Sequence, residues 1–415
     1  MRVVLGISGG VDSSVSALLL RALKKQPVDL HAVYMHNWDT DGEMCPTSSK
    51  DFIDARKTAS ALKIPLYTVN FTKEYWTNVF QPMVSALEAG LTPNPDIQCN
   101  QWIKFGAFAN LFLKQKPSQL PSQLSYAQIR MRIEEEIETL AHSKSPLVES
   151  CQVPTVHEPV ESISKLVGTA DFIATGHYAR NHSIDNSKSS ELVRALDRKK
   201  DQTYFLSTIS QASLERTIFP VGNLKKTLVK EIASKHSLEH VSRKRESMGI
   251  CFINPRVKYG DFVGEYMKLQ PGAFVTVDGD VKGVHDGIQK FTVGQRARIS
   301  GESQKWFIAD KDIKSGNITV VPGSNHPALR KKEIRIQTCT WISGISPLAQ
   351  NDSVRGALKV RHKSEPAAGL LKKGPPDEGT TQYIFEFDEP EIAIAGGQHA
   401  AFYIGEVCLG GGTIK

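Results

Sequence analysis

The chain has 415 residues and a formal net charge of +7 at pH 7, and its length predicts two or three domains rather than one core. Hydrophobic residues make up 40% of the chain and charged residues 23%, which is typical of a globular protein. No apolar run approaches the ~20 residues of a membrane span, so membrane insertion is excluded. The positive charge favours a polyanionic partner such as nucleic acid.

The cysteines exclude two classes of small structural domain. They are far apart and form no CxxC pair, which argues against a zinc ribbon and against a disulfide-stapled secreted domain; the six are Cys45, Cys99, Cys151, Cys251, Cys339 and Cys408. The N-terminal apolar run leads directly into SGG without a cleavage pattern, and no Arg- and Ser-rich transit segment is visible. We therefore expect a reducing compartment.

The N-terminal half alternates between apolar runs and helical patterns. Strands are predicted at 2–7, 29–35, 65–71 and 171–175, and helices at 13–25 and 48–62. Alternation of this kind indicates an α/β fold in which a parallel sheet carries helices on both faces.

The remaining segments differ in character. Residues 114–166 contain Gln, Ser and Pro clusters and an acidic, helix-prone run at 129–140, and we interpret them as a peripheral, partly disordered insertion. A polar loop or hairpin tip follows at 181–190, and a basic helix at 224–236. Short strands from about residue 291 predict a small antiparallel β-barrel. The expected domains are 1–218, an α+β central domain at 219–290, and the barrel at 291–415.

The strongest local motif is SGGVDSS, Ser8 to Ser14, which lies between a strand and a helix. Glycines let backbone N–H groups approach a phosphate, serine hydroxyls add hydrogen bonds, and the helix N-terminus favours an anion. The motif lacks the Lys of GxxxxGK[ST] and is not GxGxxG, so it is neither a Walker loop nor a dinucleotide fingerprint. A capped Gly-rich turn is the alternative, but Asp12 and both serines favour a phosphate site.

SGGVDSS resembles the signature of the PP-loop ATP pyrophosphatases. That resemblance implies ATP cleavage between the α- and β-phosphates and adenylation of a substrate oxygen. Mg²⁺ would accompany the pyrophosphate, with Asp12 as a contributor to its shell. The motif leaves the nucleophile open, because ammonia, an amino acid or sulfur would all fit.

Two cysteine segments favour sulfur. Cys99 follows a Pro-punctuated loop in TPNPDIQCNQWIKF, and Cys251 lies in ESMGICFI, where neither flank looks like a core strand. Cys339 and Cys408 lie in strand-like runs and are interpreted as buried, inert thiols. Cys45 and Cys151 are placed in loops.

Further motifs extend the resemblance to one family, the tRNA-specific 2-thiouridylases of bacteria and mitochondria. They occur in that family's order over nearly the whole chain, outside 114–166 and about 364–380: MHNWD, ATGHYAR, KDQTYFL, FPVG, VGQR, WFIADKD and GGQHAAFY. The resemblance implies ATP-dependent 2-thiolation of the wobble uridine of tRNA, with sulfur supplied as persulfide by a carrier derived from a cysteine desulfurase.

By the same resemblance Cys99 is the catalytic nucleophile and Cys251 receives the persulfide. The terminal sulfur of Cys251 attacks C2 of the activated uridine, or Cys99 releases hydrosulfide by forming a disulfide with Cys251. Asp96 is a candidate general acid or base, with an Asx turn as its alternative role.

The other implied site residues fall into three groups. Those expected at ATP are Gly6, Ser8, Gly9, Gly10, Val11, Asp12, Ser13, Met35 and Gly176. Those expected around the target base are Asn94, Pro95 and Asp96. Those expected to touch tRNA are His177, Lys200, Asp201, Gln202, Arg361, His362 and Gln398. The family's basic-aromatic pair reads Arg361-His362 here, which is a departure. The basic segments 225–235 and 243–245 are expected to follow tRNA phosphates.

Three alternatives stay open. An amidating or lysine-adding PP-loop enzyme would use another nucleophile. An iron-sulfur cluster held by Asp96, Cys99 and Cys251 would replace the persulfide. A tRNA-binding scaffold would retain a vestigial loop. Long insertions favour a mitochondrial location, with the cytoplasm as the alternative.

Overall fold

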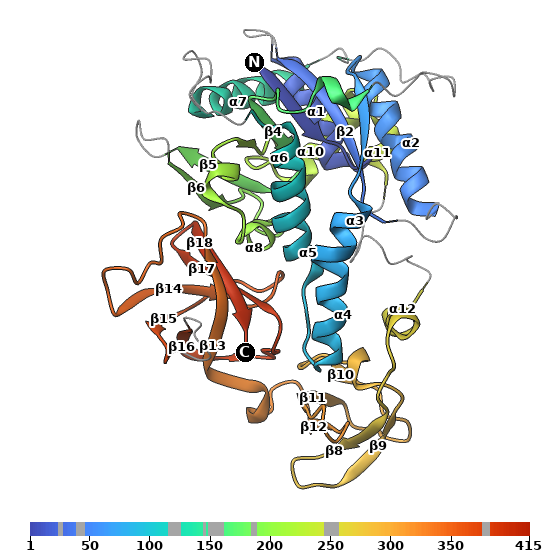
Figure 1. The fold of residues 1–415 in the computed structure, drawn as a ribbon, viewed down its shortest axis with the longest axis vertical. Helices are drawn as coiled ribbons and strands as arrows, with labels where there is room; N and C mark the ends of the chain where they lie inside the picture. The colour runs from blue at the N-terminus through green and yellow to red at the C-terminus, as the bar shows by residue number, and fades with distance from the viewer. Residues whose placement is uncertain are drawn as a thin grey trace. The chain divides into compact units, whose positions relative to one another are not determined.

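The computed structural model describes most of the chain (Figure 1): residues 1–23, 28–38, 46–114, 126–143, 147, 162–183, 189–244, 257–375 and 382–415. Contacts divide the chain into two compact units. The first unit comprises residues 1–76, 99–254 and 406–408, and the second comprises residues 77–98, 255–405 and 409–415. Each unit has its own hydrophobic core.

A five-stranded parallel sheet organises the first unit. Its order is β3-β2-β1-β4-β7, and all neighbours run parallel. The bounds are β1 Arg2–Gly6, β2 Asp29–His36, β3 Leu66–Asn70, β4 Phe172–Thr175 and β7 Thr217–Ile218. The predicted parallel sheet is confirmed, and because the strand order reverses at β1, a ligand crevice is expected at the carboxyl end of β1.

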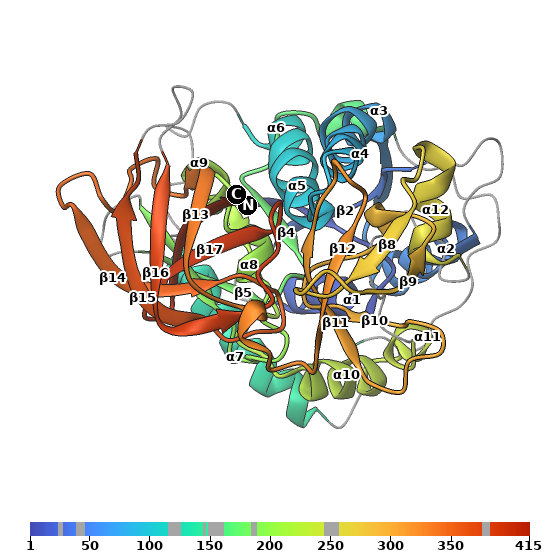
Figure 2. The same cartoon turned by 90° about the horizontal axis from the view of Figure 1, so that it is seen from below.

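Helices cover both faces of this sheet. Figure 2 shows α1 (Val11–Ala22), α7 (Tyr126–His142) and α10 (Lys226–Lys235) on one side and α6 (Phe108–Phe112) on the other. Further helices are α2 (Pro46–Ala61), α3 (Thr72–Tyr75), α8 (Thr203–Leu206), α9 (Gln211–Leu214) and α11 (Glu239–Ser242). Alternate residues of β1, Val3 and Leu5, face the core that α1 and α10 share. The sequence predicted α1, α2 and α10.

The helix α7 corrects the prediction for residues 114–166. Its apolar positions Ile129, Ile133, Ile137 and Leu140 are all buried in the core that contains α1 and α10. At its C-terminal end, the carbonyl of Leu140 lies 3.1 Å from Nε2 of His236, which follows α10. This part of the insertion is therefore a core helix rather than a peripheral segment, while 115–125, 144–146 and 148–161 lie outside the described residues.

The second unit begins with helices around a π-helical turn. After η1 (Trp76–Phe80) come α4 (Gln81–Glu88) and α5 (Pro95–Gln98), and α12 (Tyr259–Tyr266) follows later. A five-stranded sheet of order β10-β11-β12-β8-β9 comes next, with bounds β8 Gly272–Val275, β9 Val281–His285, β10 Arg296–Ala297, β11 Trp306–Lys311 and β12 Ile318–Pro322. Strands on both sides of residue 291 form this sheet, so the predicted barrel boundary at 291 falls inside it.

The predicted antiparallel barrel is confirmed in the C-terminal part. Its strands follow the order β13-β16-β15-β14-β17-β18, and β13 pairs with β18 to close it. The bounds are β13 Arg330–Trp341, β14 Ser353–Lys359, β15 Ala367–Lys373, β16 Tyr383–Ile392, β17 His399–Ile404 and β18 Val407–Ile414. In the first unit, Val407 and Cys408 pair with β6 (Ser190–Arg194), which forms a hairpin with β5 (Ala179–Ser183).

Candidate ATP and thiol site

The phosphate loop joins β1 to α1, as the sequence predicted. Gly9 has φ +69°, and a Cβ there would lie 2.0 Å from the carbonyl oxygen of Asp51. Only glycine therefore fits this turn. The backbone N–H of Ser8 donates to Oγ of Ser13 (3.1 Å), and that hydroxyl donates to the carbonyl of Gly10 (3.1 Å). These bonds hold the loop in a fixed turn at the N-terminus of a 12-residue helix, where an anion is favoured.

The residues predicted to contact ATP meet at one edge of the sheet. Met35 lies near the end of β2, and its Cε is 3.2 Å from the position that a Cβ on Gly6 would occupy. Gly176 follows β4 and packs on the start of α1, where a Cβ would lie 2.6 Å from the backbone nitrogen of Ser13. The structure thus brings Gly6, the loop 8–13, Met35 and Gly176 together at the carboxyl ends of adjacent parallel strands.

Asp12 has two partners that the sequence did not suggest. Nζ of Lys226 donates to both carboxylate oxygens of Asp12 at 2.7 Å, and the hydroxyl of Tyr178 donates to Oδ1 at 2.8 Å. Lys226 is only 8% exposed. The prediction that Lys226 follows tRNA phosphates is therefore wrong, because its ammonium is committed to the phosphate loop. Its neighbour Lys225 is exposed.

The side chain of Lys244 contacts the backbone of the phosphate loop. Its Nζ donates to the carbonyl of Gly9 (3.0 Å) and to the carboxylates of Asp51 (2.6 Å) and Asp54 (2.8 Å). Burial alone lowers the pKa of Lys244, but the hydrogen bonds and charges of the two aspartates outweigh it and raise the pKa above its usual value. Lys244 is therefore a permanent cation beside the loop, placed to hold its shape rather than to follow RNA.

Cys99 begins the π-helical segment η2 (Cys99–Ala107), which continues directly from α5. π-Helical turns are frequent at functional sites. Cys99 is buried, at 5% exposure, and forms no disulfide in the described part of the chain. Asp96 is partly exposed within α5, and Pro95 is buried beside it. Cys251 lies outside the described residues, so the predicted pairing of the two thiols stays a prediction.

His177 is enclosed between η2 and the end of β4. Its Nδ1 lies 2.8 Å from Oγ1 of Thr175, and its Nε2 lies 3.5 Å from Nζ of Lys104. Burial, and then the charge of Lys104, hold the pKa of His177 well below its usual value. The ring is therefore neutral at pH 7 and only 9% exposed, which suits a hydrogen-bonding role better than a phosphate contact.

The segment Lys200 to Gln202 supports the β5–β6 hairpin. The carboxylate of Asp201 is buried and accepts from the N–H of Ala195 (3.0 Å) and the hydroxyl of Thr203 (2.9 Å). Gln202 exchanges hydrogen bonds with both backbone groups of Tyr178. Lys200 is partly exposed. Contact of these residues with tRNA stays a prediction, and in this structure Gln202 fixes Tyr178, which donates to Asp12.

The remaining predicted tRNA residues lie in the second unit. Arg361 donates to Oε1 of Glu391 (2.9 Å), with 39% of its side chain exposed. His362 and Gln398 are partly exposed, and backbone bonds to Ala395 and Ile414 fix the loop of Gln398. Asn94 accepts from the N–H of Ile97 through its carbonyl. Each of these side chains is partly exposed, and their roles stay predictions.

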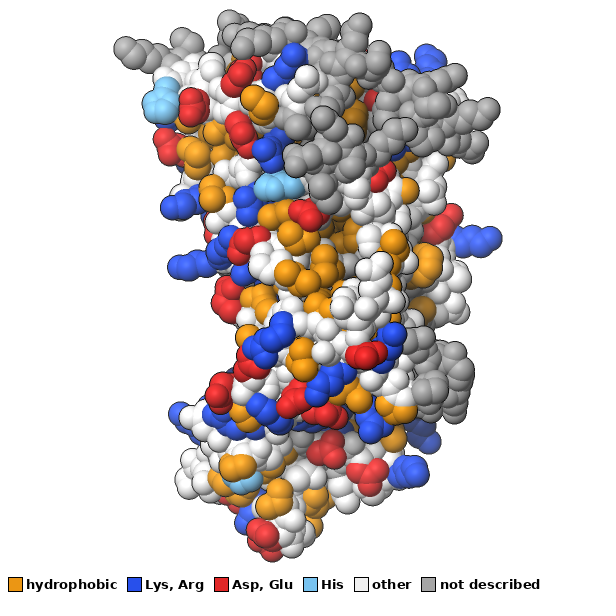
Figure 3. All heavy atoms as spheres, turned by 90° about the vertical axis from the view of Figure 1, so that its left-hand side faces the viewer, with side chains coloured by type: hydrophobic (Ala, Val, Ile, Leu, Met, Phe, Trp, Pro, Cys, Tyr) orange, Lys and Arg blue, Asp and Glu red, His pale blue; other side chains and the backbone are white. Residues whose placement is uncertain are grey.

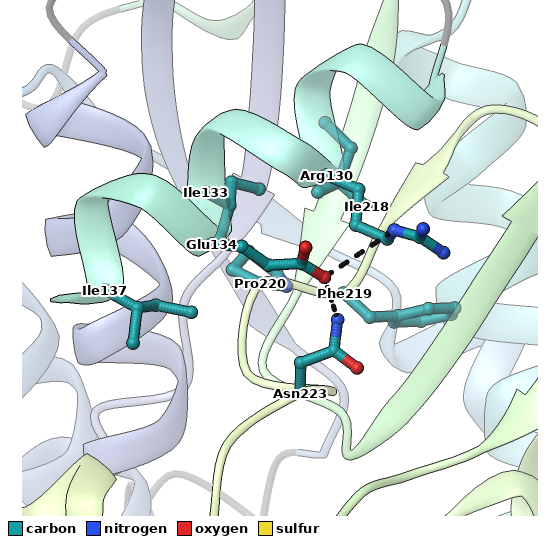
Figure 4. A pocket seen from close by; sticks show the side chains of 8 residues that line it. All are labelled: Arg130, Ile133, Glu134, Ile137, Ile218, Phe219, Pro220 and Asn223. Carbon is teal, nitrogen blue, oxygen red and sulfur yellow. Dashed lines mark hydrogen bonds and ion pairs between the residues drawn. The ribbon is translucent and has the colours of Figure 1, made fainter.

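Neither a metal-binding cluster nor a predicted ligand site is found elsewhere among the described residues. Among the described residues, no group of three or more His, Cys, Asp or Glu side chains could hold a metal ion. A shallow surface hollow lies beside α7 (Figure 4). Glu134 lines it and accepts a hydrogen bond from Asn223 (2.6 Å), with Arg130 3.6 Å away. No residue predicted from the sequence lines this hollow.

Comparison with known proteins decides the family. A model described as "tRNA methyl transferase HUP domain" matches residues 1–146 and 156–255, "tRNA methyl transferase PRC-barrel domain" matches 260–322, and "Aminomethyltransferase beta-barrel domain" matches 331–414. The tRNA-specific 2-thiouridylase MnmA of Francisella tularensis subsp. novicida is 38% identical over 421 residues, covering 100% of this chain and 99% of the relative. The chain belongs to the tRNA-specific 2-thiouridylase family. The MnmA of Vibrio cholerae serotype O1 agrees, at 36% identity over 100% of this chain and 96% of its own.

A solved structure is similar only in part. The U34-tRNA thiolase NcsA from Methanococcus maripaludis, with its 4Fe-4S cluster, aligns with 64% of each chain at a TM-score of 0.30 and 17% identity.

The relatives bear on the predicted location. Both named relatives are bacterial, so they do not support the expected mitochondrial location, which stays a prediction. No helix in the described part of the chain is long and apolar enough to cross a membrane. On the face that Figure 3 shows, Lys and Arg side chains are interspersed with Asp and Glu, so the net charge does not gather there in one basic patch.

Sequence reasoning missed four residues of this 2-thiouridylase site. Lys104, Tyr178, Lys226 and Lys244 each contact a predicted residue that lies from 73 to 235 positions away along the chain. Three of them lay inside or beside recognised motifs (IKF, GHYAR and FPVG). Lys244 had no local signal beyond its basic surroundings, because its partners, the carbonyl of Gly9 and the carboxylates of Asp51 and Asp54, are all far away in sequence.

Proposed function

We propose that this chain is an ATP-dependent tRNA sulfurtransferase that replaces the 2-oxygen of the wobble uridine with sulfur. Family membership over the whole chain supports tRNA thiolation. The observation that carries the ATP dependence is the convergence of the loop 8–13, Met35 and Gly176 at one strand edge. Similarity of fold alone would leave the chemistry open. The glycine-rich loop at the N-terminus of α1 supports a phosphate-containing ligand at this edge.

The proposed first step activates the base. O2 of the uridine attacks the α-phosphate of ATP, pyrophosphate leaves, and AMP becomes the leaving group at C2. Backbone N–H groups of the loop and the hydroxyl of Ser8 would hold the departing phosphates, and Met35 would contact the adenosine. Bound Mg²⁺ would neutralise phosphate charge; Asp12 is the one loop carboxylate that fits it, since Mg²⁺ sites use one or two carboxylates together with phosphate oxygens.

The proposed second step transfers sulfur. The terminal sulfur of a Cys251 persulfide attacks C2 and expels AMP, and the Cys99 thiolate then attacks the Cys251 sulfur, leaving sulfur on the base and a Cys99–Cys251 disulfide. In the other route, Cys99 attacks first and releases hydrosulfide, which displaces AMP. Both routes end in the same disulfide, so a thiol reductant is needed for each turnover. Asp96 would move the proton at O2 or N3.

The proposed partners are tRNA and a sulfur carrier. The target uridine must be unstacked to reach the site, at a cost of a few kcal/mol, so contacts elsewhere have to supply that energy. We assign them to Lys200, Arg361, His362, Gln398 and exposed basic residues such as Lys225. Asn94 and Pro95 would frame the base. The carrier, which delivers persulfide from a cysteine desulfurase, would load Cys251. Of the domain division 1–218, 219–290 and 291–415, the boundary after 218 stays a proposal about folding units, whereas the boundary at 291 would divide the sheet of β8 to β12.

The test is nucleoside mass spectrometry of tRNA after incubation with the protein, ATP, Mg²⁺, a persulfide donor and a thiol reductant. We expect 2-thiouridine at the wobble position, with AMP and pyrophosphate as products only when tRNA is present. Omitting ATP is the matched control and should leave the uridine unmodified. Release of ADP and phosphate, or thiolation without ATP, would contradict the proposal.

A further inference from the structure

The phosphate loop carries no cation of its own. Residues 6–14 contain one charged side chain, the carboxylate of Asp12, although the ligand proposed for the loop is strongly anionic. An unpaired carboxylate would repel phosphates at this distance. The loop therefore needs a positive charge from another part of the chain, because the lysine that Walker loops carry within their own motif is missing.

Lys226 supplies a cation at the required place. It is the first residue of α10, and its Nζ lies 2.7 Å from both oxygens of Asp12. Lys226 and Asp12 both belong to the first unit, and α1 and α10 pack in one core. The ammonium also lies 5.6 Å from the centre of the Tyr178 ring. A lysine with a side chain only 10% exposed is held here by specific contacts rather than by solvent.

The backbone around Lys226 fixes that position. Its N–H donates to Oδ2 of Asp197 (2.9 Å), which anchors the start of α10. Tyr178, which donates to Asp12, is in turn held by Gln202. The ion pair between Lys226 and Asp12 is only partly shielded from solvent, because 30% of the Asp12 side chain remains exposed. A ligand at the loop can therefore reach the ion pair.

We propose that Lys226 is a binding residue for the pyrophosphate part of ATP, a role that rests on the proposed function. Before ATP binds, its ammonium neutralises Asp12 and keeps the loop receptive to anions. With ATP bound, the ammonium serves the β- and γ-phosphates, and afterwards the pyrophosphate leaving group, while Asp12 limits its movement. The role is electrostatic, so it acts on ligands that carry the β- and γ-phosphates and not on AMP.

The experiment compares binding of an ATP analogue with a non-cleavable α–β bridge and of AMP, by isothermal titration calorimetry without tRNA. Lys226→Gln is expected to weaken analogue binding about 10- to 100-fold, the range for losing a charge-assisted contact. AMP binding should change less than about threefold. Lys226→Arg should retain more analogue affinity than Lys226→Gln. Lys225→Gln, a change at the exposed neighbour, is the matched control and should bind both ligands as the unaltered chain does.

A double variant separates ligand binding from structural support. If Lys226 only neutralises Asp12, then Lys226→Gln should have no further effect in an Asp12→Asn background. We expect an additional loss of analogue affinity there instead, in protein whose thermal unfolding shows that it is folded. Equal loss of analogue and AMP, unchanged analogue binding, or no additional loss in the double variant would each overturn the role of Lys226.

Failure of the proposed function would look different. If the unaltered chain bound the analogue but did not thiolate tRNA, the function would fail while the dependence on Lys226 could still be measured. If the chain bound no ATP analogue at all, both would fail. Thiolation at the normal rate with Lys226→Gln, together with unchanged analogue affinity, would overturn only the assignment of Lys226.

Discussion

The sheet edge of the first unit and the barrel of the second unit use charge in opposite ways. At the sheet edge, buried or half-buried cations are paired with carboxylates beside the loop: Lys226 with Asp12, and Lys244 with Asp51 and Asp54. In the barrel most of the core is apolar, although Lys359 and His399 are also buried, and ion pairs such as Arg355–Asp388 and Lys372–Glu386 lie on exposed side chains. Exposed pairs contribute little to stability, whereas a shielded pair beside a loop responds strongly to an anionic ligand. The comparison separates a region suited to chemistry from one suited to support and contact.

Each region holds a cysteine. Replacing these two cysteines should give the largest difference between the regions, measured as the rate of tRNA thiolation. Cys99→Ser is expected to lower the thiolation rate by at least about 10³-fold, because a hydroxyl cannot form the disulfide that releases sulfur. Cys339→Ser is the control: burial raises the pKa of the Cys339 thiol to about 12, so it is inert at pH 7. The rate of 2-thiouridine formation measures both. Comparable loss in the two variants would remove the catalytic assignment of Cys99.

Glycines offer a second contrast, in ATP affinity. Gly176→Ala should displace the start of α1, because the added Cβ would lie 2.6 Å from the backbone nitrogen of Ser13. We expect ATP binding to weaken at least about tenfold and the free energy of unfolding to fall by roughly 1–3 kcal/mol. Gly405→Ala has no atom within 4 Å of its added Cβ, although φ is +55°. It should cost about 1 kcal/mol of stability and leave ATP binding unchanged. Equal ATP affinity in both variants would show that the packing of Gly176 on α1 is irrelevant to the nucleotide.

Each region also contains a buried histidine, and these predict a dependence of stability on pH. Burial lowers the pKa of His399 in the barrel to about 3, and the pKa of His177 is also well below 6.5. Above pH 6.5 both are neutral in the folded and unfolded chain. As the pH falls below 6.5, only the unfolded chain takes up the protons, so the free energy of unfolding decreases by up to about 1.4 kcal/mol per pH unit for each histidine.

Chemical denaturation between pH 7 and pH 5 measures this effect. In His399→Gln the free energy of unfolding should fall less steeply with decreasing pH, because one fewer histidine takes up a proton on unfolding. This holds whatever the effect of the change on absolute stability. His326→Gln is a control, since His326 lies outside the buried set. An unchanged slope with His399→Gln would mean that this ring is not kept neutral in the barrel.

The smallest expected effect concerns tRNA. Lys225→Gln should weaken tRNA binding modestly and reduce the slope of log affinity against log salt by about 0.7 to 0.9, the change for losing one phosphate contact. ATP affinity should not change, in contrast to Lys226→Gln. Fluorescence anisotropy of labelled tRNA at several salt concentrations measures the slope. An identical slope in Lys225→Gln would exclude this residue from the RNA-binding surface.

Much of the first unit could be predicted from local sequence. Strands at 29–35 and 65–71, the loop at 8–14 and the helix after it were all predicted, because apolar periodicity and glycine placement depend on neighbouring residues. The peripheral role predicted for the segment that forms α7 was wrong. Its polar and acidic composition suggested a peripheral segment, while Ile129, Ile133 and Ile137, spaced four residues apart, already marked one apolar helical face.

The sequence by itself determined which residues can do chemistry: a glycine-rich loop without its own lysine, a thiol behind TPNPD, and alternating strands that form a parallel sheet. Tertiary structure alone decided which distant cation completes the loop, because Lys226 is 214 residues from Asp12 along the chain. Lys225 and Lys226 look equivalent in sequence. In the structure, however, Lys225 is the extended residue just before α10 and is exposed, whereas Lys226 is the first helical residue and its ammonium contacts Asp12 of the phosphate loop.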